Sequence, residues 1–296
     1  MIPIILIIEM NCSICVSIIT PSYNQGMYLE QTIQSVLNQT YGNIEYLAVD
    51  GGSTDNSIDI IKKYEKSIAY WISEPDNGQA NAINKGFKHA NGELVCWVNS
   101  DDILYPDYVV NRVQQFKENT NVDMIYGDIE QGPEPSIRRL RKGRQTSIKN
   151  MLKYAECPIP QQSAMWRRNV IEKIGYLAPQ WHVILDREYF IRMAANRLIK
   201  YVPGAVAFFR NHEHSKSIVD KLKWAEELPR YYEMVFNDNI YHLSPNLLSY
   251  KGKCLSKIYL KCAKIFANAG KKREAEDFLA QSKKVSFCNY ILERYF

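Results

Sequence analysis

The sequence predicts an α/β protein with a mainly parallel central sheet flanked by helices, followed by a helical appendage at the C-terminal end. From Val16 onward, short apolar runs alternate with segments of helical periodicity, which is typical of βαβ units. The run at residues 94–98 is almost wholly apolar, as expected of a strand covered on both faces. The 296 residues suffice for one catalytic-sized domain and an additional region.

The first hundred residues show the clearest alternation. Four runs are short, apolar and rich in β-branched residues, and we expect strands at residues 16–20, 44–49, 68–73 and 94–98. Apolar residues recur at helical spacing between them, which predicts helices at residues 28–38, 58–64 and 82–90. Polar loops with the sequences PSYNQG, DGGSTD, EPDNGQ and NSDD follow the four strands. Ligands of parallel sheets bind at the carboxyl ends of the strands, so we expect these loops to converge on one site.

The pattern changes after residue 105. We expect a helix at residues 106–119, a strand at residues 122–128 and then the basic stretch RRLRKGR at residues 138–144. Beyond residue 220 the chain is helical in character, with a helical hairpin predicted around Gly270. We expect an apolar extension at residues 1–15 and then one domain at residues 16–220, whose two halves are residues 16–105 and 106–220. A C-terminal region follows at residues 221–296.

The positive charge is concentrated in the C-terminal region. The net charge of the chain is +5, but residues 221–296 contain 14 Lys and Arg against 8 Asp and Glu, which leaves residues 1–220 at −1. A nearly neutral first domain argues against a nucleic-acid partner. The seven cysteines are scattered and odd in number, which favours a reducing compartment over a disulfide framework. No apolar run is long enough to span a bilayer, so we expect a cytoplasmic protein.

Carboxylates stand at the ends of two predicted strands. Asp101 and Asp102 follow the strand at 94–98, and adjacent like charges are costly unless a cation or hydrogen bonds compensate them. Mg²⁺ or Mn²⁺ bridged to substrate phosphates would do so, and a helix N-cap is the alternative. Asp50 ends the second strand before Gly51 and Gly52, where its carboxylate could accept a hydrogen bond from a base or a ribose hydroxyl, or cap a turn.

Several motifs together resemble family 2 of the glycosyltransferases, which have the Rossmann-like GT-A fold. The nucleotide-binding half of that family is similar to VSIITPSYNQGMYLEQTIQSVLNQTYGNIEYLAVDGGSTDNS and to EPDNGQANAINKGFKHANGELVCWVNSDD. Its bacterial acceptor half resembles PQQSAMWRR, LDREYFIRMA and FRNHEHSKS. These motifs occur in order from Val16 to Ser217, whereas the C-terminal region has no such match. The resemblance implies a GT-A domain over residues 16–220.

The resemblance also implies a donor site. Asp50 would bind the base of a nucleotide diphosphate sugar, with a UDP-sugar the favoured donor, and the same nucleotide pocket would contain Pro21, Tyr23, Asn24, Asp101, Gly78 and Asn84. Asp102 together with Asp101 would bind the Mn²⁺ or Mg²⁺ that carries the diphosphate. The acidic triplet of the family is often Asp-x-Asp, and Asn99 replaces its first carboxylate here, which leaves the geometry of the metal open.

The candidate base lies in LDREYFIR. Asp186 and Glu188 are two residues apart, so one helical face cannot present both carboxylates. One should face the cleft while the other caps the helix or forms a pair, for example with Arg192. In the similar acidic motif of the family the first carboxylate is usually the base, which favours Asp186 and leaves Glu188 as the alternate.

Further residues of the acceptor half are implied at the site. Arg210 and His212 resemble an Arg-x-His motif near the diphosphate, where His212 would bind the metal or a phosphate oxygen and His214 is a rival. Gln161 and Gln162 would hydrogen-bond sugar hydroxyls. Trp166 or Trp181 would stack on a sugar, although a buried tryptophan more often belongs to the core.

The expected reaction is an inverting sugar transfer to a hydroxyl of a saccharide or a lipid-linked acceptor, in the synthesis of a cell-surface polysaccharide or glycoconjugate. Asp186 would remove the proton of the attacking hydroxyl. The alternatives are a sugar nucleotidyltransferase and a non-catalytic protein that binds nucleotide sugars or nucleic acid. We also expect the basic C-terminal region to contact the anionic inner face of the cell membrane.

Overall fold

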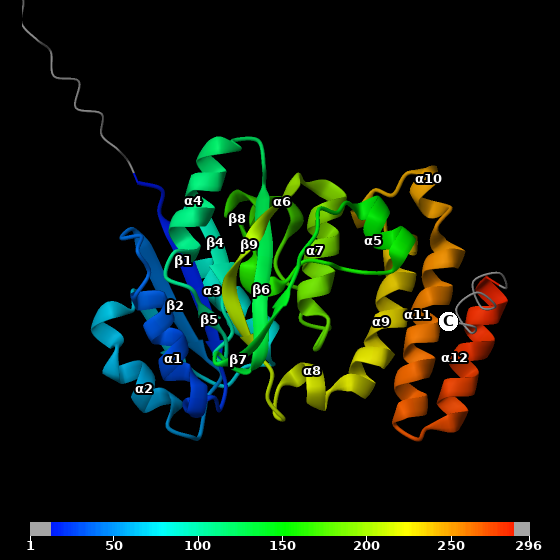
Figure 1. Cartoon of the computed structure of the whole chain (residues 1–296), viewed down its shortest axis with the longest axis horizontal. Helices are drawn as coiled ribbons and strands as arrows, with labels where there is room; N and C mark the ends of the chain where they lie inside the picture. Colours follow the sequence, from blue (N-terminus) through cyan, green and yellow to red (C-terminus); the bar gives the residue numbers. More distant parts are fainter. Residues whose placement is uncertain (1–12, 287–296) are drawn as a thin grey trace, which may run out of the picture.

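A nine-stranded sheet lies at the centre of the computed structural model, which describes residues 13–286 (Figure 1). The expectations for most of the apolar extension and for the end of the basic region therefore lie outside the described residues. Eight strands form one path in the order β3-β2-β1-β4-β8-β6-β9-β5, and β7 pairs with β6. Helices cover both faces of the sheet, as predicted for an α/β protein.

The first four strands pair in parallel, as the sequence predicts. They are β1 (Val16–Ser22), β2 (Ile44–Asp50), β3 (Tyr70–Ser73) and β4 (Leu94–Trp97). Three α-helices and one short 3₁₀ helix connect them, namely α1 (Gly26–Leu37), α2 (Ser57–Lys63), η1 (Glu65–Ser67) and α3 (Gln79–His89).

Alternating side chains of these strands supply two hydrophobic cores. Ile18 packs on one face with Leu29 of α1, and the next residue, Ile19, packs on the other face with Phe87 of α3. Helix α3 lies so close to β1 that a Cβ atom on Gly86 would be 2.4 Å from Cγ2 of Ile19. A side chain at this position would push the helix away from the sheet. The glycine therefore lets α3 pack closely on β1, which positions the loop before α3.

The second half of the sheet mixes parallel and antiparallel pairs. Strand β8 (Met165–Arg167) runs antiparallel to both β4 and β6 (Met124–Glu134), whereas β6 and β9 (Ile199–Arg210) are parallel. The short β5 (Ile103–Leu104) and the exposed β7 (Ile137–Arg141) form antiparallel edges. Around them lie α4 (Tyr108–Glu118), α5 (Ile148–Tyr154), η2 (Gln161–Ser163), α6 (Asn169–Ile174) and α7 (Leu185–Asn196). The predicted parallel sheet thus describes the first half, and the second half is mixed.

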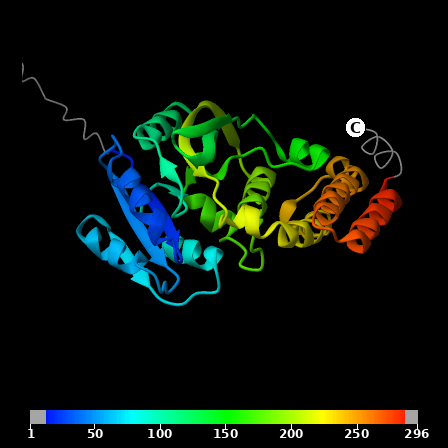
Figure 2. The same cartoon turned by 60° about the horizontal axis from the view of Figure 1, so that its bottom comes forward.

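The C-terminal region packs against the sheet domain through its first long helix. Helix α9 (Lys221–Asn237) lies between α7 and the hairpin of α11 (Lys251–Asn268) and α12 (Lys272–Val285), which forms one end of the molecule in both views (Figures 1 and 2). The short α8 (Lys216–Val219), η3 (Asn239–Tyr241) and α10 (Pro245–Leu248) complete the chain. The hairpin predicted around Gly270 is confirmed.

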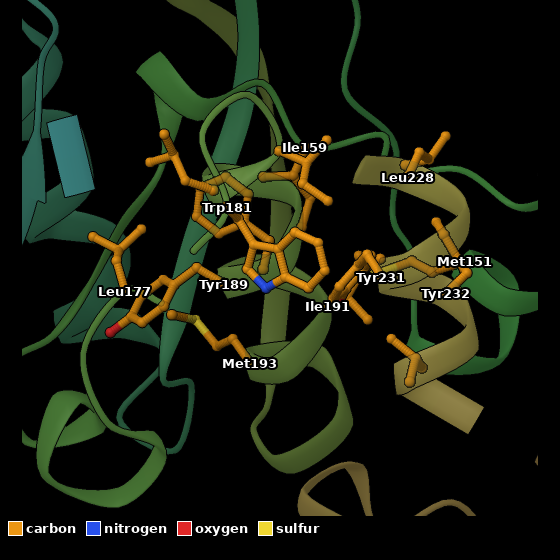
Figure 3. Close-up of a cluster of buried hydrophobic side chains, with 14 of the residues drawn as sticks. Met151, Ile159, Leu177, Trp181, Tyr189, Ile191, Met193, Leu228, Tyr231 and Tyr232 are labelled. Atoms are coloured by element: carbon orange, nitrogen blue, oxygen red, sulfur yellow. The ribbon is translucent and has the colours of Figure 1, made fainter. Parts of the chain in front are cut away.

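The buried face of α9 belongs to the same core as α7. Leu228, Tyr231 and Tyr232 of α9 are buried beside Trp181 and Tyr189 (Figure 3), and the rings of Trp181 and Tyr231 are 5.6 Å apart in an edge-to-face contact. Among residues 13–286, no helix is both long and apolar enough to cross a membrane. The five cysteines of this part of the chain are free thiols.

Candidate active site

A cavity of about 1150 Å³ opens along the carboxyl ends of β1 to β4. Its first part is lined by residues of the four polar loops, namely Pro21 and Tyr23, Gly51 and Gly52, Asp76, Gly78 and Gln79, and Asn99 to Asp101. The predicted convergence of these loops is therefore confirmed. From there the cavity continues past Asp186 of α7 and Lys216 of α8 to Trp224 of α9 and Ile265 of α11.

The two adjacent carboxylates of the NSDD loop face different surroundings. Asp101 lines the cavity, and its Oδ2 lies 3.0 Å from Nε2 of His212. Asp102 is fully buried and does not line the cavity, because its carboxylate accepts hydrogen bonds from Asn99, Gln162 and the backbone of Arg210. Burial raises the pKa of Asp102 well above its ordinary value, and the charge of Asp101 adds to the effect. Asp101 is thus the carboxylate available to a ligand.

The side chain of Arg210, at the end of β9, holds the NSDD loop in place. Its Nε donates to the backbone carbonyl of Asp101 at 3.0 Å and its Nη2 to Oε1 of Gln31 at 2.6 Å, so the buried guanidinium does not line the cavity. The imidazole of His212 is largely buried, and its Nδ1 has no hydrogen-bond partner among the described residues. His212 does not line the cavity itself but contacts Asp101, which does, whereas the exposed His214 lines the cavity.

Asp50 organises the loop after β2 from inside the protein. It is fully buried, and its carboxylate accepts hydrogen bonds from the backbone of Gly52 and Ser53 and from the hydroxyls of Ser53 and Ser73. Asn24, in the left-handed conformation, ties the neighbouring loop to this one, because its Oδ1 accepts from the backbone of Thr54 at 2.8 Å. Neither Asp50 nor Asn24 lines the cavity; both hold the two loops that do.

The loop before α3 brings polar groups that the sequence reasoning missed. Oδ1 of Asp76 accepts a hydrogen bond from the backbone of Gly78 at 2.7 Å, and Gly78 adopts a φ of +109° that suits a glycine. Both residues line the cavity. Asn84 lies one turn inside α3, where its amide exchanges two hydrogen bonds with the backbone of Leu177. Asn84 therefore anchors the loop that contains Leu177 and does not line the cavity. Asp76 could have been identified as a site residue from the sequence, because it lies in the EPDNGQ loop that was expected at the site.

Gln161 and Gln162 line the cavity floor through their place in η2. The Gln161 amide bridges the carbonyl of Trp97 and Nδ2 of Asn99 at 2.8 and 3.2 Å, and Gln162 bonds Asp102.

The sugar-stacking role expected of Trp166 is corrected by the structure. Its indole is fully buried and packs edge-to-face against Trp97 and Phe87, so it belongs to the core. Trp181 is likewise buried, against Tyr231.

The start of α7 separates its two carboxylates. Asp186 is partly buried and lines the cavity. Glu188 is buried in a bidentate ion pair with Arg192, at 2.7 and 2.8 Å, and desolvation raises its pKa although the guanidinium opposes this. The structure therefore leaves Asp186 as the carboxylate that an acceptor could reach.

Lys216 is a further cavity residue that the sequence reasoning did not single out, although it lies in the FRNHEHSKS motif. Its Nζ donates to Oε1 of Gln79 at 3.2 Å, at the N-terminal end of α3. Burial lowers the pKa of Lys216 to about 8. A cation held at this point can interact with phosphate groups placed at the helix end.

Helix α9 also contributes residues to the site, and no sequence motif in this helix predicted that contribution. Glu227 is buried and accepts hydrogen bonds from the backbone of His182 and Val183, in the loop that leads into α7. Its neighbour Trp224 lines the cavity and packs against the guanidinium of Arg187, whose carbon is 5.5 Å from the ring centre.

The possible metal ligands at the site suit a divalent ion that also binds a phosphate group of the substrate. Asp101 and His212 offer a carboxylate oxygen and a largely buried imidazole side by side, and no group of three or more His, Cys, Asp or Glu in the described ranges could hold an ion by itself. Mg²⁺ and Mn²⁺ are commonly held by one or two protein ligands together with substrate phosphates. The residues present therefore fit an ion that arrives with a diphosphate.

Comparisons with known proteins agree with this geometry. The sequence profile described as "Glycosyl transferase family 2" matches residues 17–175. An uncharacterized glycosyltransferase of Mycobacterium tuberculosis strain H37Rv is 32% identical over 191 residues, which cover 60% of this chain and 68% of the relative. An uncharacterized glycosyltransferase of Nostoc sp. is 30% identical over 208 residues, covering 67% of this chain and 65% of the relative.

Solved structures share the fold at low sequence identity. Staphylococcus aureus TarS in complex with UDP-GlcNAc has a TM-score of 0.65 and 17% identity, covering 92% of this chain and 82% of that one. A mannosyltransferase of Pyrobaculum calidifontis in complex with GDP-Man and Mn²⁺ has a TM-score of 0.63 and 18% identity, covering 93% and 77%. Against another crystallised TarS chain, this chain spans 54% of the length.

Proposed function

This chain belongs to family 2 of the glycosyltransferases and has their GT-A fold, and from that premise we propose how its cavity carries out sugar transfer from a nucleotide sugar. The donor is a nucleotide diphosphate sugar, with a UDP-sugar the first candidate. It binds across the loops after β1 to β4, with the base between Tyr23 and Asp76 and with Asp50 holding the loop behind it. The UDP-GlcNAc in the TarS complex and the GDP-Man in the mannosyltransferase complex support this class of donor.

The diphosphate lies between the NSDD loop and the start of α3. In our proposal Asp101 and His212 hold the divalent ion, and Asp102 positions Asn99 and Gln162 behind them. The chemistry supplied by bound Mn²⁺ or Mg²⁺ is neutralisation of charge on the phosphate oxygens. Lys216 and the N-terminal end of α3 place further positive charge where the nucleoside diphosphate departs.

Asp186 acts as the general base on the acceptor side. It lines the same cavity, whereas Glu188 is occupied by Arg192. Asp186 removes the proton of an acceptor hydroxyl as that oxygen attacks the anomeric carbon, and the configuration inverts because the attack comes from the face opposite the leaving group. The acceptor is a saccharide or a lipid-linked glycan precursor.

A single observation carries this proposal: one continuous cavity contains both the converging strand-end loops and Asp186. The test is a thermal-shift screen of UDP-, GDP- and other nucleotide sugars, with and without Mn²⁺. A ligand that binds only the native state raises the melting temperature, by an amount that grows with its concentration over Kd. At least one nucleotide sugar should raise the melting temperature, and should raise it more when Mn²⁺ is present. If no nucleotide sugar raises it, the proposed donor site is refuted.

We further propose that the helical hairpin of α11 and α12 contacts an anionic membrane surface. Helix α11 contains five lysines and no Asp or Glu, and Lys264, Lys272 and Arg273 are exposed. Each lysine or arginine near such a surface contributes about 1 kcal/mol. The full chain should co-sediment with phosphatidylglycerol vesicles but not with phosphatidylcholine vesicles. Equal sedimentation of a variant with Gln at the three positions would contradict the proposal.

A further inference from the structure

The part of the cavity beyond Asp186 is lined by cations that the donor chemistry does not use. Arg187 reaches it from α7, Arg141 from the end of β7 and Lys221 from the start of α9. Asp186 and Asp220 are the carboxylates that line the same part. Because Asp186 is already assigned to the acceptor hydroxyl, the remaining charge at this end is positive.

The guanidinium of Arg187 is partly enclosed and forms no ion pair among the described residues, although the charge of the neighbouring Asp186 acts on it. It is partly buried, donates to the hydroxyl of Tyr232 at 3.3 Å and packs against the ring of Trp224. In the described part of the chain no carboxylate lies within ion-pair distance of it. Enclosing a charge is costly unless an opposite charge compensates it, so the position suits an anionic ligand.

Arg141 approaches the same place from a different element. Its strand is exposed, and no ion pair engages its guanidinium among residues 13–286. Both arginines and Asp186 act electrostatically on the Cys157 thiol, whose pKa burial raises to about 11 while the two arginines oppose the rise. Cys157, the two arginines and Asp186 all line the cavity, so the two guanidinium groups and the candidate base face the same ligand space.

We propose that the acceptor carries a phosphate group that binds between Arg141 and Arg187, and thereby presents a neighbouring hydroxyl to Asp186. A guanidinium can bind two phosphate oxygens at once, which fixes orientation as well as affinity. Trp224 offers an apolar surface beside the phosphate. This inference rests on the proposed function, because it names the class of acceptor for the same site.

The test measures binding of sn-glycerol 3-phosphate by calorimetry at saturating UDP and Mn²⁺, so that the donor site is filled. Glycerol serves as the uncharged control ligand. Arg187→Gln and Arg141→Gln are the test variants, and Arg139→Gln is the matched control because Arg139 lies on the same strand but does not line the cavity. Arg187→Lys keeps the charge and covers the case in which Arg187→Gln does not fold.

The unmodified chain and Arg139→Gln should bind glycerol 3-phosphate but not glycerol, and Kd should rise about tenfold or more in Arg187→Gln and Arg141→Gln. Arg187→Lys should retain part of the affinity. If UDP binds normally but glycerol 3-phosphate does not, or if all variants bind it equally, the phosphate site is refuted while the donor site stands. Competition by phosphatidic acid vesicles would identify a lipid-borne phosphate, and its absence a water-soluble one.

Discussion

Glu227 provides the sharpest test of whether the C-terminal region belongs to the catalytic machinery. Its buried carboxylate accepts hydrogen bonds from the backbone N–H groups of His182, at 2.9 and 3.1 Å, and of Val183, at 3.0 Å. These groups lie three and four residues before Asp186. The Glu227→Ala change would leave these two part-buried N–H donors without their partner in the protein.

The expected cost follows from those two donors. An unsatisfied buried donor costs about 1–3 kcal/mol, so the loss of a partner for two donors in Glu227→Ala should lower the free energy of unfolding by about 2–6 kcal/mol. This is less than the stability of most domains, at about 5–15 kcal/mol, so the variant should still fold in the cold. The Glu227→Ala change should also loosen the loop that leads into α7 and displace Asp186. A displacement of about 1 Å should reduce kcat about 100-fold and leave the affinity for UDP unchanged.

The assay combines urea unfolding, followed by tryptophan fluorescence, with steady-state transfer kinetics and UDP binding. The neighbouring Glu226→Ala is the matched control, because Glu226 is exposed on the same helix. Glu227→Gln keeps one carbonyl oxygen and should restore part of the rate. A Glu227→Ala variant that is destabilised as expected but retains normal kcat would refute the positioning role.

Three further outcomes are expected. Asp186→Asn should reduce transfer by about 10²–10⁴-fold, as loss of a general base does, while the thermal shift with UDP stays unchanged; retained turnover would remove the role. Asp101→Asn should abolish the extra stabilisation that Mn²⁺ gives to the UDP complex, and an unchanged Mn²⁺ increment in melting temperature would contradict its assignment. The pKa of Lys216 is lowered to about 8 from 10.5, so the native state carries the full cost of its buried charge below pH 8 and is relieved of it as pH rises to about 10.5. Lys216→Met should therefore increase the free energy of unfolding by about 1–3 kcal/mol at pH 7 and by less at pH 10, as measured with urea; an equal gain at both values would show that the charge is not the cause.

The first half of the fold could be predicted because each strand carries its own signal. Ile18 and Ile19 are both apolar since each faces a hydrophobic core, and this is visible as a continuous apolar run. Strand β8 has only three residues, Met165–Arg167, and it exists because β4 and β6 pair with it from either side. Such a strand is defined by its neighbours and leaves no periodicity to detect.

The site shows the same division between local and distant causes. The spacing of Asp186 and Glu188 predicts that one carboxylate faces the cleft while the other caps the helix or forms a pair. In the structure Asp186 lines the cavity and Glu188 pairs with Arg192. The difference between Asp101 and Asp102 could not be predicted, since Gln162 and the backbone of Arg210 decide it from positions far along the chain. Glu227 escaped notice for the same reason, because its partners are backbone groups that no side-chain motif reports.

The cavity joins the earliest strands of the chain to its last long helices, and this has a consequence for synthesis on the ribosome. The loops of β1 to β4 emerge first, but Trp224 and Ile265 complete the opposite end of the cavity only after most of the chain has been translated. Residues of α7, α9 and α11 also share one hydrophobic core, so that core and the far end of the cavity can be completed only after these helices have been translated.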